Sequence, residues 1–223
     1  TILSTKLLTH LQALLSAAFF HFLAYAIFEL KIADTIAKVV DTTAITLNVI
    51  LAGIIAAIIW NLLTWYLGIP SSSSHTLVGG FAGAAIAHAG WGVVHSGLII
   101  KIAAFIFLAP LLGMIFSYFI SILLLNLLRK GNPHILEKYF KQLQLLSSAL
   151  FSLGHGGNDA QKVMGIIAAT LMVYFNGVDA ASIPEWAQIT LVEGKIHAIP
   201  HWVVFGCYAA IGAGTLSGGW RIV

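Results

Sequence analysis

The sequence predicts an all-α integral membrane protein, a helical bundle in which some helices are re-entrant or broken. Composition is the first indication: 9% of the residues are charged, against roughly 25% in a typical soluble domain, and 59% are hydrophobic. Apolar stretches of about 20 residues, the length that crosses a bilayer, recur along the chain. The net charge of +3 is small and no long basic run occurs, so nothing in the composition indicates a nucleic-acid partner.

Four segments are predicted as membrane spans. Residues 11–30 form the first, although a few polar side chains interrupt it. Residues 44–67 lack any charged side chain and form the clearest span. Residues 98–128 are long enough to cross at a steep tilt. The last span begins at residue 202, after a polar loop at residues 176–200.

Residues 131–146 are predicted to form an amphipathic helix in the membrane interface. Asn132 suits the N-cap position, and Pro133 suits the first position inside the helix. Apolar side chains then recur at helical spacing, opposite charged ones. Because Arg129 and Lys130 come just before this helix, the positive-inside tendency predicts that the loop is cytoplasmic.

The segment "PSSSSH", residues 70–75, places hydroxyls and an imidazole between two apolar stretches. Residues 70–88 are therefore predicted to form a broken or re-entrant helix that opens near Thr76. A helix that begins at membrane depth presents unpaired N–H groups and a positive dipole end, and both attract anions. Serines at such a place also often just cap or pack helices, so this alternative stands beside the first. The hydroxyls that can donate to an oxyanion belong to Ser72, Ser73, Ser74 and Thr76.

The segment "GHGGNDAQK" interrupts a second apolar region and predicts a broken helix over residues 147–175, opening near Asp159. Asn158 can donate to an oxyanion through its amide. Asp159 repels an anion, and a buried acid is costly unless it is paired or neutralised. We therefore expect a cation or a proton on Asp159. Lys162, one turn away, either pairs with it structurally or helps to hold the anion.

Two interrupted helices that point at one anionic substrate are a known arrangement in transporters. The stretches "IIWNLLTWYLGIPSSSSHTLVGG" and "GHGGNDAQKVMGI" also resemble the signatures of the inorganic phosphate transporter family, the Pit-type phosphate permeases. The likeness covers nearly the whole chain. It implies two inverted repeats, each with one motif of each type, of which this chain carries one copy each. The chain is thus expected to be an internal fragment: a first-repeat region at residues 1–130, the linker helix, and the start of the second repeat at residues 147–223.

The resemblance implies a symporter that moves inorganic phosphate, free or as a metal–phosphate complex, together with protons or sodium ions. Asp159, with Asn158, is implied as the coupling-ion site. His75 and Lys162 are candidate accessory residues from their own chemistry, and for His75 the alternative is that it only satisfies a backbone carbonyl. No cofactor, resident metal or enzymatic activity is expected. The expected setting is a bacterial inner membrane, crossed several times, with a homodimer as the assembly. The phosphate-binding residues implied are Ser72, Ser73, Ser74, Thr76, Asn158, Asp159 and Gln161.

Three other functions fit the same residues. A sulfate or other oxyanion permease would use the same fold and the same helix-end chemistry. An anion channel would use several weak sites along a pore instead of coupled uphill transport. In a membrane subunit that transports nothing, the two motifs would only be irregularities of packing.

Overall fold

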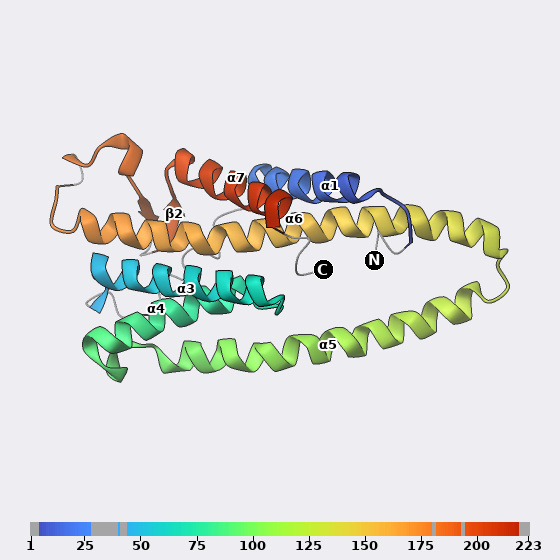
Figure 1. Ribbon diagram of the computed structural model, residues 1–223, viewed down its shortest axis with the longest axis horizontal. Helices are drawn as coiled ribbons and strands as arrows, with labels where there is room; N and C mark the ends of the chain where they lie inside the picture. Colours follow the sequence, from blue (N-terminus) through green and yellow to red (C-terminus); the bar gives the residue numbers. More distant parts are fainter. Residues whose placement is uncertain (1–4, 28–39, 41–43, 180–181, 193–194, 219–223) are drawn as a thin grey trace.

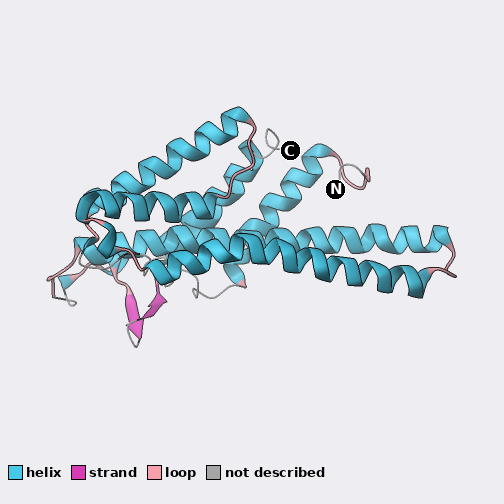
Figure 2. Ribbon diagram, turned by 90° about the horizontal axis from the view of Figure 1, so that it is seen from below, coloured by secondary structure: helices cyan, strands magenta, loops and turns pink. Residues whose placement is uncertain are grey.

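The computed structural model describes residues 5–27, 40, 44–179, 182–192 and 195–218. The molecule is elongated and mostly helical, as expected (Figures 1 and 2). A long helix, α6, runs along its length, with α1 and α7 on one side and α3 and α4 on the other (Figure 1). This arrangement brings segments from both ends of the chain against the same central helix.

Helices α3 (Leu47–Leu67) and α4 (Ser73–Ala89) form an antiparallel hairpin. α3 ends at Gly68, whose φ of 69° is the left-handed C-cap conformation that glycine adopts without steric cost. The two backbones touch closely: a Cβ on Gly80 would lie 2.6 Å from the carbonyl oxygen of Gly53. Apolar side chains of both helices, with Ile166 of α6, form the first hydrophobic core. The hairpin is therefore held rigidly, with its turn directed toward α6.

Helices α1 (His10–Leu23) and α7 (His201–Gly218) pack against α6 (Pro133–Tyr174). Side chains of α6 and α7, with Ala24 and Ile196, form the second hydrophobic core. A short 3₁₀ turn, η1 (Ala24–Ala26), continues α1. The contact between α1 and α6 depends on Gly156, because a Cβ there would lie 2.7 Å from the Cα of His21. Glycine at this position lets two helices approach to backbone contact.

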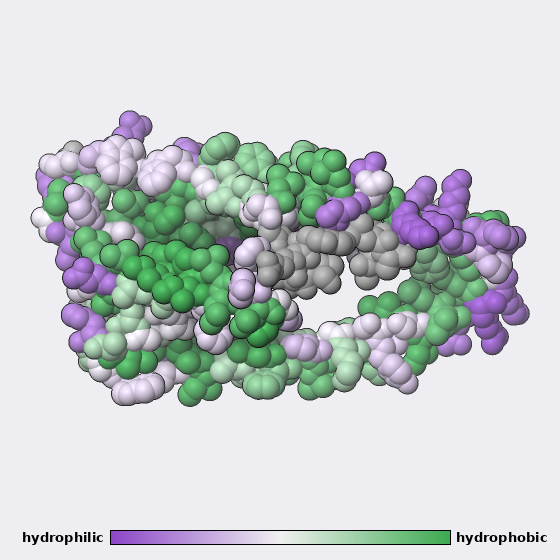
Figure 3. All heavy atoms as spheres, in the orientation of Figure 1, coloured by the Kyte–Doolittle hydropathy of each residue, from purple (hydrophilic) through white to green (hydrophobic). Residues whose placement is uncertain are grey.

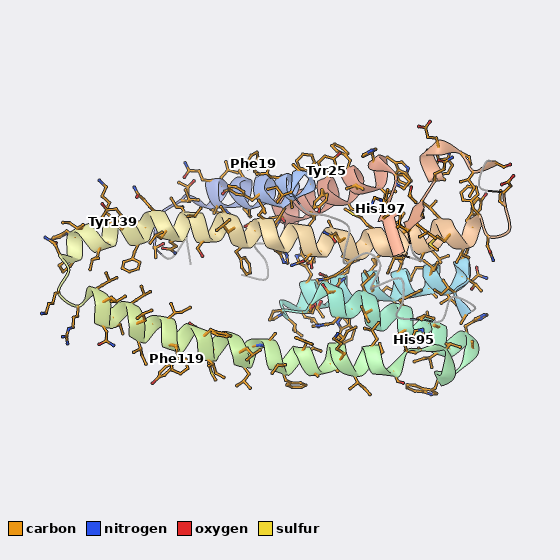
Figure 4. The ribbon with its side chains drawn as sticks, turned by 180° about the vertical axis from the view of Figure 1, so that it is seen from behind. Phe19, Tyr25, His95, Phe119, Tyr139 and His197 are labelled. Atoms are coloured by element: carbon orange, nitrogen blue, oxygen red, sulfur yellow. The ribbon has the colours of Figure 1, made fainter. Side chains whose placement is uncertain are left out.

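Helix α5 (Ser96–Leu128) follows the short turn η3 (Trp91–Val93) and has no buried residue. Most of its apolar side chains are exposed, such as Phe119 (Figure 4), whereas Leu98, Ile99 and Ile102 near its start pack against the first hydrophobic core. Among the described residues, α3 and α5 are long and apolar enough to cross a membrane, with mean hydropathies of 2.1 and 2.5. They match the spans predicted at residues 44–67 and 98–128. A helix with apolar side chains on every face suits a lipid environment. Hydrophilic side chains gather at the turn between α5 and α6 (Figure 3).

The structure corrects the predicted break in the second motif. Residues 147–175 and the predicted interfacial helix at 131–146 belong to one continuous helix, α6, of 42 residues. Each glycine lowers helical stability by only about 1 kcal/mol, and the buried Gly156 and Gly157 allow the close packing that offsets this loss. The start of α6 is as predicted. Pro133 is the first helical residue, and the side chain of Asn132 accepts a hydrogen bond from the N–H of His134.

The all-α prediction also needs a small correction in the loop at residues 176–200. Within it lie a 3₁₀ turn, η5 (Glu185–Ala187), and two short antiparallel strands, β1 (Thr190–Val192) and β2 (Lys195–Ala198). β-Branched residues in both strands favour this conformation. The inverted-repeat relation and the division of the chain at residues 1–130, 131–146 and 147–223 stay predictions.

Gly156→Ala should destabilise the protein by about 1–3 kcal/mol, the usual effect of overpacking a close contact. The added methyl would meet the backbone of His21 and push α1 away from α6. Thermal unfolding of the purified protein in detergent measures the change.

The matched control is Gly154→Ala on the same helix, where no atom lies within 4 Å of the added Cβ. This variant should be neutral, or more stable by up to about 1 kcal/mol, because alanine favours the helix. Equal destabilisation by both variants would contradict the role given to Gly156.

Candidate functional site

The turn between α3 and α4 carries the "PSSSSH" motif to the middle of α6 (Figure 1). The hydroxyl of Thr64, on α3, and that of Ser71 are hydrogen-bonded at 2.9 Å, which fixes the turn. Ser72 is the N-cap of α4, and its hydroxyl accepts a hydrogen bond from the N–H of His75 at 3.4 Å. The helix that was predicted to begin near Thr76 therefore begins at Ser73. A serine just before a helix stabilises the first turn, because its hydroxyl accepts a hydrogen bond from a backbone N–H.

Asp159 lies where α4 begins, and four side chains surround its carboxylate. Ser73 Oγ donates to Oδ2 at 3.4 Å, and Ser74 Oγ donates to Oδ1 at 3.2 Å. Lys162 Nζ lies 2.8 Å from Oδ1 and also donates to the hydroxyl of Ser74. His155 Nε2 lies 3.6 Å from Oδ2. We call Ser73, Ser74, Asp159 and Lys162 the carboxylate cluster.

The charges of the carboxylate cluster balance one another. The side chains of Asp159 and Lys162 are 19% and 21% exposed, so both are largely removed from solvent. Asp159 is the one acidic residue between Tyr139 and Tyr174 in the sequence. A partly buried carboxylate needs a cation and hydrogen-bond donors to remain charged. Lys162 supplies the cation and the two serines supply the donors.

A cavity of about 860 Å³ adjoins the cluster, between the turn before α4 and helices α6 and α7. Its walls on α7 are mostly apolar and include Val203 and the thiol-bearing Cys207. Its polar lining comes from Ser71, Ser73, Asp159 and other side chains of α3 and α6. An apolar cavity with a few convergent polar groups is the usual form of a small-molecule site.

The other predicted site residues lie outside the hydrogen bonds of the carboxylate cluster. Asn158 is exposed on α6, and Gln161 is almost completely buried, at 1% exposure. The hydroxyl of Thr76 donates to the carbonyl of Ser72 at 2.9 Å, within the first turn of α4. Ser72 and His75 line a second cavity, of about 460 Å³.

Sequence analysis missed two groups near the cluster. His155 precedes Asp159 by four residues, which places both on one face of a helix; the predicted break hid this periodicity. His21, from α1, lies next to it, with the ring centroids 5.2 Å apart, and its Nδ1 is 2.8 Å from the hydroxyl of Thr215 on α7. No local signal in the sequence relates His21 to Thr215, because 194 positions separate them.

The chain resembles known proteins along its whole length. The model of the phosphate transporter family matches residues 1–223. A probable low-affinity inorganic phosphate transporter of Rhizobium meliloti (strain 1021) is 42% identical over 225 residues, which are 100% of this chain and 62% of that protein. Its counterpart in Bacillus subtilis (strain 168) is 38% identical over 226 residues, which are 100% of this chain and 63% of that protein. This chain therefore spans less than two thirds of the length of either relative.

A solved structure, "The sodium-dependent phosphate transporter", superimposes with a TM-score of 0.82 at 21% identity. It covers 100% of this chain, and the match covers 70% of that chain. The two chains thus share one fold. The relatives are transporters and membrane proteins, not enzymes, as the sequence predicted.

Lys162→Met should destabilise the protein by about 1.5–3 kcal/mol, the usual contribution of a hydrogen bond to a charged group. The change leaves the largely buried carboxylate of Asp159 without its cation. Thermal unfolding in detergent measures the effect.

The matched control is Lys138→Met, at an exposed position near the start of α6. The double variant Asp159→Asn/Lys162→Met should recover part of the loss, since neither charge is then unpaired. Purely additive effects would contradict the pairing of Asp159 with Lys162.

Proposed function

The chain belongs to the phosphate transporter family, and from this premise we propose that it is part of a secondary active symporter for inorganic phosphate. The observation that carries the proposal is the contact between the N-terminus of α4 and Asp159. At this contact, hydrogen-bond donors suited to an anion lie beside a carboxylate suited to a cation. An anion site and a cation site in contact are what symport requires. The substrate is phosphate, free or as a metal–phosphate complex.

We assign phosphate binding first to Ser73 and Ser74, whose hydroxyls lie at the start of α4. The N–H groups of this first turn and the dipole of α4 favour an anion at the same place. Lys162 adds a positive charge within reach of Ser74. The family resemblance supplies the rest of the proposed site, which is Ser72, Thr76, Asn158, Gln161 and the accessory His75.

We assign the coupling cation to Asp159, assisted by Asn158. The carboxylate is the one acidic group in its stretch of α6, and an unneutralised charge there would be costly. Sodium ions and protons are both suited to a carboxylate. The name of the similar solved structure, a sodium-dependent phosphate transporter, supports sodium as one candidate.

The protein as a whole is proposed to cross a bacterial inner membrane several times and to act as a homodimer. The long apolar helices α3 and α5 support the membrane location. Alternating access would follow from rocking of the two repeats about the site, as in other inverted-repeat transporters.

Asp159→Asn should abolish cation-driven accumulation of phosphate, because the amide keeps the shape of the side chain and removes its charge. The measurement is uptake of radiolabelled phosphate by the full-length protein in proteoliposomes, with the sodium gradient and the pH gradient imposed separately. Glu137→Gln is the matched control: it makes the same chemical change on the same helix, at an exposed carboxylate paired with Lys141 at 2.7 Å. Uphill uptake by Asp159→Asn would contradict the assignment.

Ser73→Ala and Ser74→Ala should each weaken phosphate binding by about 1–3 kcal/mol, the cost of leaving a buried polar partner unsatisfied. The half-saturation concentration for uptake measures this loss. Ser217→Ala, at an exposed position of α7, serves as the control. A half-saturation concentration unchanged in both variants would mean that these hydroxyls only stabilise the start of α4.

A further inference from the structure

We propose that phosphate and Asp159 compete for the same hydrogen-bond donors, so that a monovalent cation on Asp159 releases them for phosphate. Lys162 is the positioning residue that moves between the two anions. The inference rests on the proposed function, and it goes further by naming the interaction that couples the cation to the anion.

The donors assigned to phosphate already have an acceptor within the protein. Ser73 and Ser74 each direct their hydroxyl to the carboxylate of Asp159, at 3.4 and 3.2 Å. A serine hydroxyl has one hydrogen and donates it to one acceptor at a time. Phosphate therefore gains these two donors only if Asp159 gives them up.

The charges also require a change at Asp159 before phosphate binds. Phosphate bound at the start of α4 would lie next to the Asp159 carboxylate, and two negative charges in a partly buried site repel each other strongly. Lys162, 2.8 Å from Oδ1, neutralises only one of them. When a proton or a sodium ion neutralises Asp159, both the repulsion and the need of the carboxylate for donors decrease.

Lys162 has the reach to serve either anion. Its ammonium carries three hydrogens on a flexible four-carbon chain. It contacts Ser74 and Asp159 together. A rotation of this side chain would keep the contact with Ser74 and exchange the carboxylate for a phosphate oxygen.

Other polar and ionisable groups near the carboxylate of Asp159 influence whether it binds a sodium ion or a proton. On α6, His155 Nε2 lies 3.6 Å from Oδ2. From α1, the ring of His21 lies next to the ring of His155. From α4 come the two serines, and from α7 come Cys207, on the wall of the adjoining cavity, and Thr215, at His21. The experiment therefore treats sodium ions and protons separately.

The test is equilibrium binding of radiolabelled phosphate to the full-length protein in detergent. One series varies sodium at constant pH, and a second varies pH without sodium. In the unmodified protein, the active cation should raise phosphate affinity roughly 5–150-fold, the usual range for coupling between two sites. In Asp159→Asn the charge that holds Lys162 is removed, and the amide keeps one acceptor oxygen where the carboxylate had two. Phosphate should therefore bind without cation more tightly than to the unmodified protein. Glu137→Gln should behave as the unmodified protein does.

The Asp159→Asn result separates donor competition from a merely structural ion pair. If that variant binds cation-free phosphate no more tightly than the unmodified protein does, or keeps the same cation dependence, the inference is overturned while the proposed function stands. If the full-length unmodified protein neither binds nor transports phosphate, the proposed function fails as well.

A second measurement needs no variant. Coupling between two sites is reciprocal, so phosphate must raise the affinity for the active cation by the same factor. Binding of radiolabelled sodium, or proton uptake in weakly buffered solution, measures the affinity for the cation with and without phosphate.

Lys162→Gln should lower phosphate affinity at saturating cation, because the released donors then lack the ammonium. Unchanged affinity there would contradict the role of Lys162.

Discussion

The arrangement of the site depends on the carboxylate of Asp159, which needs a neighbouring cation and hydrogen-bond donors. Asp159 lies in the middle of α6, in the polar segment between two apolar stretches, and its side chain is largely removed from solvent. It stays charged at acceptable cost only if a cation and several donors surround it. Lys162 comes from the next turn of the same helix, but the serines come from α4, 85 and 86 positions away in the chain. Satisfying Asp159 therefore fixes the tip of the α3–α4 hairpin against α6.

Glycines make this contact possible from both sides. Gly53 and Gly80 let α3 and α4 pack backbone to backbone, so the hairpin is thin and stiff. Gly156, three residues before Asp159, allows α1 to approach α6 in the same way and brings His21 beside His155. Gly156, which belongs to the segment that the sequence analysis interpreted as a break in a helix, is thus a packing position. It sets how near α1 comes to the carboxylate.

The two motifs show why only part of the site could be predicted. "PSSSSH" contains a proline followed by a serine N-cap, and both act locally, so the start of α4 was predictable to within three residues. "GHGGNDAQK" contains helix-weakening glycines, whose effect depends on what packs against them. That partner is α1, more than 130 positions distant, and a local analysis has no access to it. The face of α6 that carries His155, Asp159 and Lys162 appears only once the helix is known to be continuous.

Continuity of α6 changes how the site can attract an anion. Two helix N-termini at one point would supply two positive dipole ends, but in the described residues only α4 begins there. Each dipole end is equivalent to roughly half an elementary charge, so a single one does not neutralise phosphate. The ammonium of Lys162 is a nearby source of the missing positive charge, and it lies 2.8 Å from the carboxylate of Asp159. Under the proposed mechanism, the anion binds tightly only when another cation takes the place of Lys162 at the carboxylate.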